Sequence, residues 1–78
     1  MPSYQRSRQH WKRTNWAKDE WEYIDLWSHR LLGEVRAHNR HFLASTWSMT
    51  GEVSLLGWFI TVGGAKRAIE EACHAKAA

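Results

Sequence analysis

The sequence predicts an α+β fold in which a three- or four-stranded antiparallel β-meander packs against one C-terminal α-helix. Two observations lead to this prediction. Segments of alternating apolar and polar residues recur between short turns, and this is the period of half-buried strands. The last part of the chain then changes to the three- and four-residue spacing of an amphipathic helix. Because the expected connections are short, we expect neighbouring strands to run antiparallel.

The first fourteen residues differ from the rest in charge. Residues 1–14 carry four basic side chains and no acid, whereas residues 15–78 carry seven Lys or Arg and eight Asp or Glu. The net charge of +3 therefore divides into +4 and −1. We expect a flexible basic arm over residues 1–14 and a single α+β domain over residues 15–78. Such an arm is either a solvated terminus or a contact for phosphate or an acidic protein surface.

Residues 15–27 fit two structures. As a strand, they place Trp21, Tyr23 and Trp27 on one face together with Asp25. As a helix, they would use Asn15 as the N-cap, with acidic residues near the positive end of the helix dipole. The aromatic content and the acids at alternate positions favour the strand, and the helix remains the alternative.

Three further segments are predicted as strands. Residues 31–38 and 42–49 alternate between apolar and polar positions, and a turn at Asn39 separates them, where asparagine tolerates the left-handed conformation. Gly51 marks the next turn, since glycine adopts positive φ without a steric cost. Residues 54–60 are apolar on both faces, as expected for a strand that a helix covers on one side.

The helix is predicted to begin after Thr61, whose hydroxyl can accept a hydrogen bond from an N–H group of the first turn. Its apolar side chains recur at helical spacing at Ala65, Ala68, Ile69, Ala72 and Cys73. We expect this stripe to pack on the sheet, with Ile69 as its largest side chain.

Residues able to carry chemistry are sparse. Cys73 is the only cysteine and has no base placed beside it. His38 and His41 are three residues apart around a turn, but a zinc site needs at least one further ligand. We therefore expect no catalytic residue, no metal and no cofactor. No apolar run approaches the ~20 residues of a membrane span, and no signal peptide precedes the chain, which indicates a cytoplasmic protein.

Basic and aromatic side chains alternate along the arm, a combination that can stack on bases or dock on a protein groove. Together with Trp16 and two arginines of the predicted strands they form the predicted partner-binding set: Arg6, Arg8, Trp11, Lys12, Arg13, Trp16, Arg36 and Arg40. Trp21, Trp47 and Trp58 fall inside predicted elements and are expected in the core.

Residues 55–72, LLGWFITVGGAKRAIEEA, pass from a Gly-aromatic strand through Thr61 into an Ala-rich helix. This segment is similar to the last strand and helix of DNA-binding domains of the AP2 and phage integrase arm-binding type. The resemblance implies three strands and a helix, with Arg and Trp of the sheet entering the major groove. The matching strands here offer Arg36, Arg40 and Trp47.

In size and in its six tryptophans the whole chain is also similar to small phage and prophage accessory proteins of the anti-CRISPR type. This resemblance implies a non-enzymatic inhibitor that docks on a CRISPR effector in the host cytoplasm and blocks its DNA path. Three functions thus stand as hypotheses. They are an inhibitor that docks on a protein or nucleoprotein complex, a DNA-binding domain that uses its sheet and arm, and a structural protein that self-associates as a homodimer.

Overall fold

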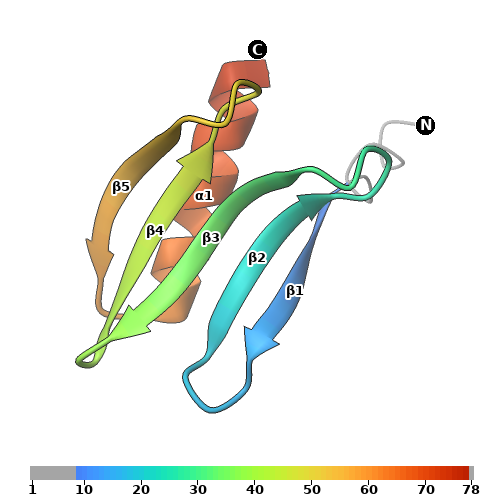
Figure 1. Cartoon of the computed structure of the whole chain (residues 1–78). Coiled ribbons are helices and arrows are strands. Elements are labelled where there is room, and N and C mark those ends of the chain that lie inside the picture. The colour runs from blue at the N-terminus through green and yellow to red at the C-terminus, as the bar shows by residue number, and fades with distance from the viewer. Residues whose placement is uncertain (1–8, 78) are drawn as a thin grey trace.

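A five-stranded antiparallel sheet with one helix across one face makes up the computed structural model (Figure 1). The structure describes the backbone of residues 9–77 and the side chains of residues 9–74. The elements are β1 (Gln9–Asn15), β2 (Glu20–Asp25), β3 (Leu31–His38), β4 (His41–Trp47), β5 (Val53–Phe59) and α1 (Val62–Ala77). Each strand pairs with its neighbour in sequence, so the sheet is a meander. The predicted α+β class is confirmed, with five strands instead of three or four.

The additional strand, β1, comes from residues that the sequence assigned to the arm. Its backbone pairs with β2 from Gln9 opposite Asp25 to Asn15 opposite Glu20. β1 lies at an edge of the sheet and buries only part of one face. Such a strand needs few apolar side chains, and Trp11 is its only large one among the described residues. The prediction of coil for residues 9–14 is therefore wrong. The remainder of the predicted arm, including Arg6 and Arg8, lies outside the described residues.

Residues 15–27 take the strand alternative, because their central part forms β2. Asn15 caps the β1–β2 loop instead of a helix. Its Oδ1 accepts hydrogen bonds from the backbone N–H groups of Ala17, at 3.1 Å, and Lys18, at 3.3 Å. Asp19 then takes a positive φ of 58°, a conformation that Asp tolerates better than most residues.

The β3–β4 connection is a two-residue turn. Asn39 and Arg40 have φ values of 49° and 68°, as in the type I′ turn, whose twist matches that of antiparallel strands. His38 and His41 pair directly across the base of this turn. The prediction of a left-handed Asn39 is confirmed.

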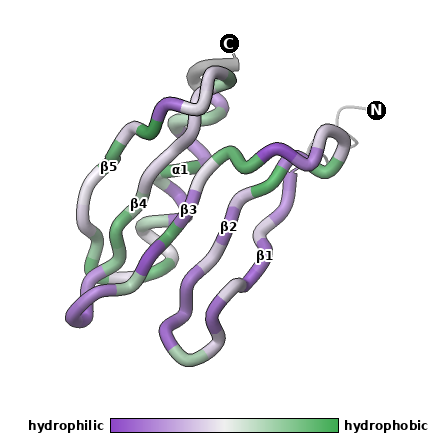
Figure 2. Tube along the Cα trace, in the orientation of Figure 1, coloured by the Kyte–Doolittle hydropathy of each residue, from purple (hydrophilic) through white to green (hydrophobic). Residues whose placement is uncertain are grey.

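The helix begins as predicted, with the Thr61 hydroxyl accepting a hydrogen bond from the N–H of Gly64 at 3.0 Å. Ala65 and Ile69 are fully buried against Val35 and Ala44 of the sheet. α1 packs on β3, β4 and β5, whereas β1 and most of β2 are hydrophilic (Figure 2). The core therefore lies mainly between α1 and the β3–β5 half of the sheet, and Tyr23 of β2 extends it toward β1.

Candidate interaction surface

The sheet has one face covered by α1 and one open face, and the strand register assigns residues to each. Residues directly opposite each other share a face. One row across the open face runs through Lys12, Glu22, Glu34, Ser45 and Leu55. A second row runs through Arg36, Leu43 and Trp58. The predicted binding residues therefore divide between two surfaces.

Trp11 lies on the helix side and is engaged within the chain. Its indole Nε1 donates a hydrogen bond to Oε2 of Glu70 at 2.9 Å. Its ring packs on Tyr23, with the ring centroids 4.6 Å apart. Burial raises the pKa of Tyr23, and the nearby Glu70 carboxylate adds to that rise. Trp11 thus fastens β1 to the helix and offers little surface to a partner.

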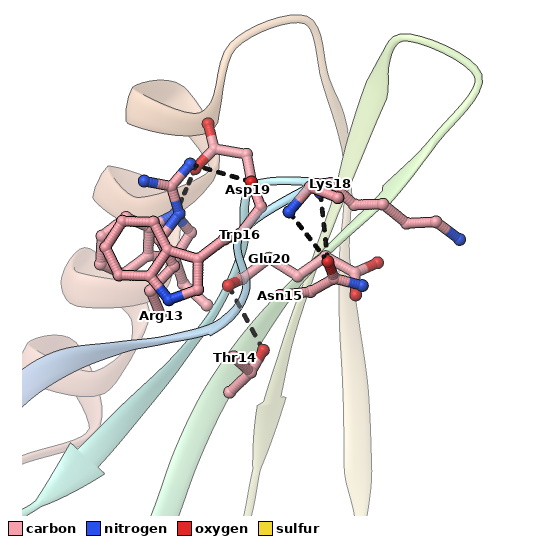
Figure 3. A network of polar contacts seen from close by, with 9 residues as sticks. Arg13, Thr14, Asn15, Trp16, Lys18, Asp19 and Glu20 are labelled. Atoms are coloured by element: carbon pink, nitrogen blue, oxygen red, sulfur yellow. Dashed lines mark hydrogen bonds and ion pairs between the residues drawn. The ribbon is translucent and has the colours of Figure 1, made fainter.

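Arg13 is also used internally (Figure 3). Its Nη2 forms an ion pair with Oδ1 of Asp19 at 3.1 Å, and its guanidinium lies over the ring of Trp16, 4.4 Å from the centroid. Trp16 itself is 75% exposed. Cation–π contact therefore ties this exposed tryptophan of the β1–β2 loop to the sheet.

Lys66 of α1 reaches the same cluster from the other side. Its Nζ lies 3.2 Å from the centroid of the Trp21 ring. Burial lowers the pKa of the Lys66 ammonium, while Asp19 and Glu70 act to raise it. The cluster thus joins β1, β2 and α1 through aromatic and charged groups, and this contact is structural.

On the open face, apolar side chains gather over β4 and β5. Five of them, here called the apolar strip, are Leu43, Trp47, Val53, Leu55 and Trp58. Three belong to β5 and remain largely exposed: 51% for Val53, 68% for Leu55 and 55% for Trp58. β5 ends the strand order, so no described strand pairs with its outer edge. The strip and this edge form a continuous surface without a charged side chain on β5.

The middle of the open face carries charge. Lys12 lies opposite Glu22, and Glu22 lies opposite Glu34. Burial raises the pKa of Glu34, Arg36 acts to lower it, and Glu22 and Glu20 raise it further. Two like charges directly opposite each other on neighbouring strands reduce stability. The other contacts of the sheet must therefore offset the repulsion between Glu22 and Glu34.

The end of the open face near the β3–β4 turn is hollowed. Adjoining depressions of about 540 and 420 Å³ there share Lys18 and His38 in their linings. Arg36 and Trp58 also line the larger depression, and Arg40 lines the smaller. We call these two neighbouring depressions, with the three cations of their combined lining, the cationic hollow. Lys18 extends away from the Arg13 cluster toward this side of the loop (Figure 3).

The predicted set is therefore not one contact surface. Trp11 and Arg13 serve the fold, and Lys12 faces a carboxylate. Arg36 of β3 and Arg40 of the β3–β4 turn lie at the cationic hollow together with residues that were not predicted. The missed residues are Lys18, His38, Leu55 and Trp58. Trp58 was expected in the core. Its exposure follows from the edge position of β5, which the alternation pattern does not reveal.

Known proteins offer no guide to this surface. Neither protein-family models nor curated proteins nor solved structures match the chain. Among the described residues, no group of three His, Cys, Asp or Glu could hold a metal ion. Nor does the described part contain a helix with the length and apolar character needed to cross a membrane.

Proposed function

We propose that this protein is a non-enzymatic binding module that docks on a protein or nucleoprotein complex through the apolar strip and the outer edge of β5. The observation that supports this most is the exposure of Val53, Leu55 and Trp58 on a strand with an unpaired edge. Large apolar side chains in a contiguous exposed patch are typical of protein-binding sites. An unpaired strand edge also offers backbone groups to an incoming strand of a partner.

The most specific form of the proposal is an inhibitor of the anti-CRISPR type, seated on a CRISPR effector so that DNA cannot enter. Its support is the small size and the tryptophan content of the chain. The mixed surface is compatible with this role, because protein interfaces commonly combine an apolar centre with a charged rim. Glu22 and Glu34 supply one side of such a rim, and Arg36 supplies another.

The alternative of a sheet that reads duplex DNA has less support from the geometry. Phosphates lying across the sheet would meet Glu22 and Glu34, which face the same side as Arg36. Repulsion between carboxylates and phosphates opposes such a complex. The support for this alternative is the resemblance of residues 55–72 to the last strand and helix of AP2 and integrase arm-binding domains.

The first test is affinity capture of the tagged protein from host lysate, with and without nuclease. We expect a stoichiometric protein complex that survives nuclease and is lost with Leu55→Lys, because a lysine on the strip places an unpaired charge in the interface. The control is Glu71→Gln on the exposed surface of α1, which changes the net charge by the same amount. Capture of nucleic acid alone, or equal capture by both variants, would reject the proposal.

A further inference from the structure

Beyond the docking surface, the cationic hollow has the character of a ligand site. Lys18 of the β1–β2 loop lines both depressions, Arg36 of β3 lines the larger one, and Arg40 of the β3–β4 turn lines the smaller one, so three separate segments contribute cations to the pair. Its larger part measures about 540 Å³, and Trp58 is among its lining residues. That volume is within the range of small-ligand sites in proteins.

The cations of the hollow outnumber the carboxylates around them. None of the three forms an ion pair with a described residue, whereas Arg13 does with Asp19. Glu20 is the one carboxylate in the lining, where its Oε2 accepts a hydrogen bond from the N–H of Ala37 at 3.0 Å, and Glu34 interacts with Arg36 from outside it. Three cations against these two carboxylates leave a local excess of +1 with the histidines neutral. An anion is therefore the favoured ligand.

The backbone of the β3–β4 turn supports this assignment. Arg40 holds a left-handed φ of 68° directly after Asn39 at 49°. The left-handed conformation costs an arginine roughly 1 kcal/mol, whereas asparagine or glycine would tolerate it better. The turn thus keeps a strained cation at the rim of the hollow.

An aromatic ring lies beside these cations. Trp58 is 55% exposed, and its ring centroid is 6.1 Å from that of His38 at an interplanar angle of 53°. Aromatic rings next to a basic groove are the usual means of binding single-stranded nucleic acid, because bases stack on the rings while phosphates meet the cations. An acidic peptide would use the cations and leave the ring unoccupied.

We propose that the cationic hollow binds single-stranded nucleic acid, with phosphate oxygens at Lys18, Arg36 and Arg40 and a base stacked on Trp58. A single strand fits better than a duplex because its bases are free to stack on the ring. The site shares Leu43 and Trp58 with the apolar strip but does not involve Leu55, so a change at Leu55 distinguishes it from the proposed docking function.

Fluorescence anisotropy with a labelled thymidine oligomer tests the proposal on the full chain. We expect binding at low salt that weakens about tenfold with Trp58→Ala, since stacking on one base is lost. Arg36→Ala should weaken binding and reduce the slope of log K against log salt by about 0.7, the value for one phosphate contact on a single strand. The matched control is Arg67→Ala, which removes an exposed cation on α1 and should leave the slope unchanged.

Three results would overturn the proposal: no binding of the oligomer at low salt, equal effects of Arg36→Ala and Arg67→Ala, or a poly-glutamate peptide bound as tightly as the oligomer. Leu55→Lys separates this site from the docking surface. We expect that variant to keep its oligomer affinity while losing the captured protein, so failure of one proposal is distinguishable from failure of the other.

Discussion

At the scale of single residues, the row of acids on the open face shows how a surface can be kept at a cost in stability. Glu34 lies directly opposite Glu22 and is half-buried, and both circumstances disfavour its ionised form. An apolar or neutral residue would fit this position with less cost. The facing carboxylates of Glu22 and Glu34 lie between the apolar strip and the hydrophilic β1–β2 half of the sheet.

We expect Glu34→Gln to stabilise the protein at pH 7 by about 0.5 kcal/mol, the scale of one unfavourable cross-strand pair. Because the folded-state pKa of Glu34 is raised, the folded chain binds this proton more tightly than the unfolded chain. The wild-type protein therefore loses stability as pH rises through the interval from the unfolded pKa to the raised folded pKa. The gain from Gln is complete above that interval and absent below about pH 4.

Urea denaturation at pH 7 and below pH 4 measures this difference. Glu52→Gln, in the exposed β4–β5 turn, makes the same change in charge and serves as the control. A gain that is the same at both pH values, or one that Glu52→Gln reproduces, would show that the pairing with Glu22 is not its source.

At the scale of elements, the contact between α1 and the sheet depends on the absence of a side chain at Gly33. A Cβ there would lie 2.5 Å from Cγ2 of Ile69 and 3.0 Å from the carbonyl oxygen of Ser45. We expect Gly33→Ala to destabilise the protein by about 1–3 kcal/mol, as overpacking of a tight core does. The neighbouring backbone oxygen leaves the new methyl group little room to move.

The matched control is Gly63→Ala, because a Cβ at Gly63 meets nothing within 4 Å and the residue lies in the first turn of α1. That change should leave stability unchanged or raise it by up to about 1 kcal/mol through helix propensity. Thermal unfolding measures both effects, and we expect a lower melting temperature for Gly33→Ala only. Equal destabilisation by the two alanines would refute the close approach at Gly33.

The elements of the core half were predictable from sequence, whereas β1 and the open face were not. Strands β3 and β4 and helix α1 carry regular apolar periods because each buries one whole side. β1 carries a single large apolar group, Trp11, so its sequence does not show the alternation of apolar and polar residues that identifies a strand. In the sequence, Trp58 and Leu55 belong to a strand that is apolar on both faces, which suggests that both faces are buried. Only the strand order shows that β5 ends the sheet and leaves their side of it uncovered.

At the scale of the whole molecule, stability is distributed unevenly across the sheet. The buried core consists of Val35, Ala44, Ala65 and Ile69, which join β3, β4 and α1, and of Tyr23, its one member from β2. The hydrophilic β1–β2 half is fastened to α1 by side chains of the aromatic cluster, among them Trp11. We therefore expect amide hydrogen exchange to be fastest in β1 and slowest in β3 and β4, because regions with few buried apolar contacts open first.

Trp11→Phe tests this division, since it keeps an aromatic ring and removes the N–H that donates to Glu70. We expect faster exchange in β1 and β2 with little change in β3 and β4. Trp16→Phe alters an exposed ring instead and should leave both halves unchanged. The β1–β2 loop also carries Lys18, so loosening this half should weaken oligomer binding at the cationic hollow without unfolding the core. Acceleration of exchange to the same extent in all five strands would mean that the sheet opens as one unit, and that the hollow and the core share a single stability.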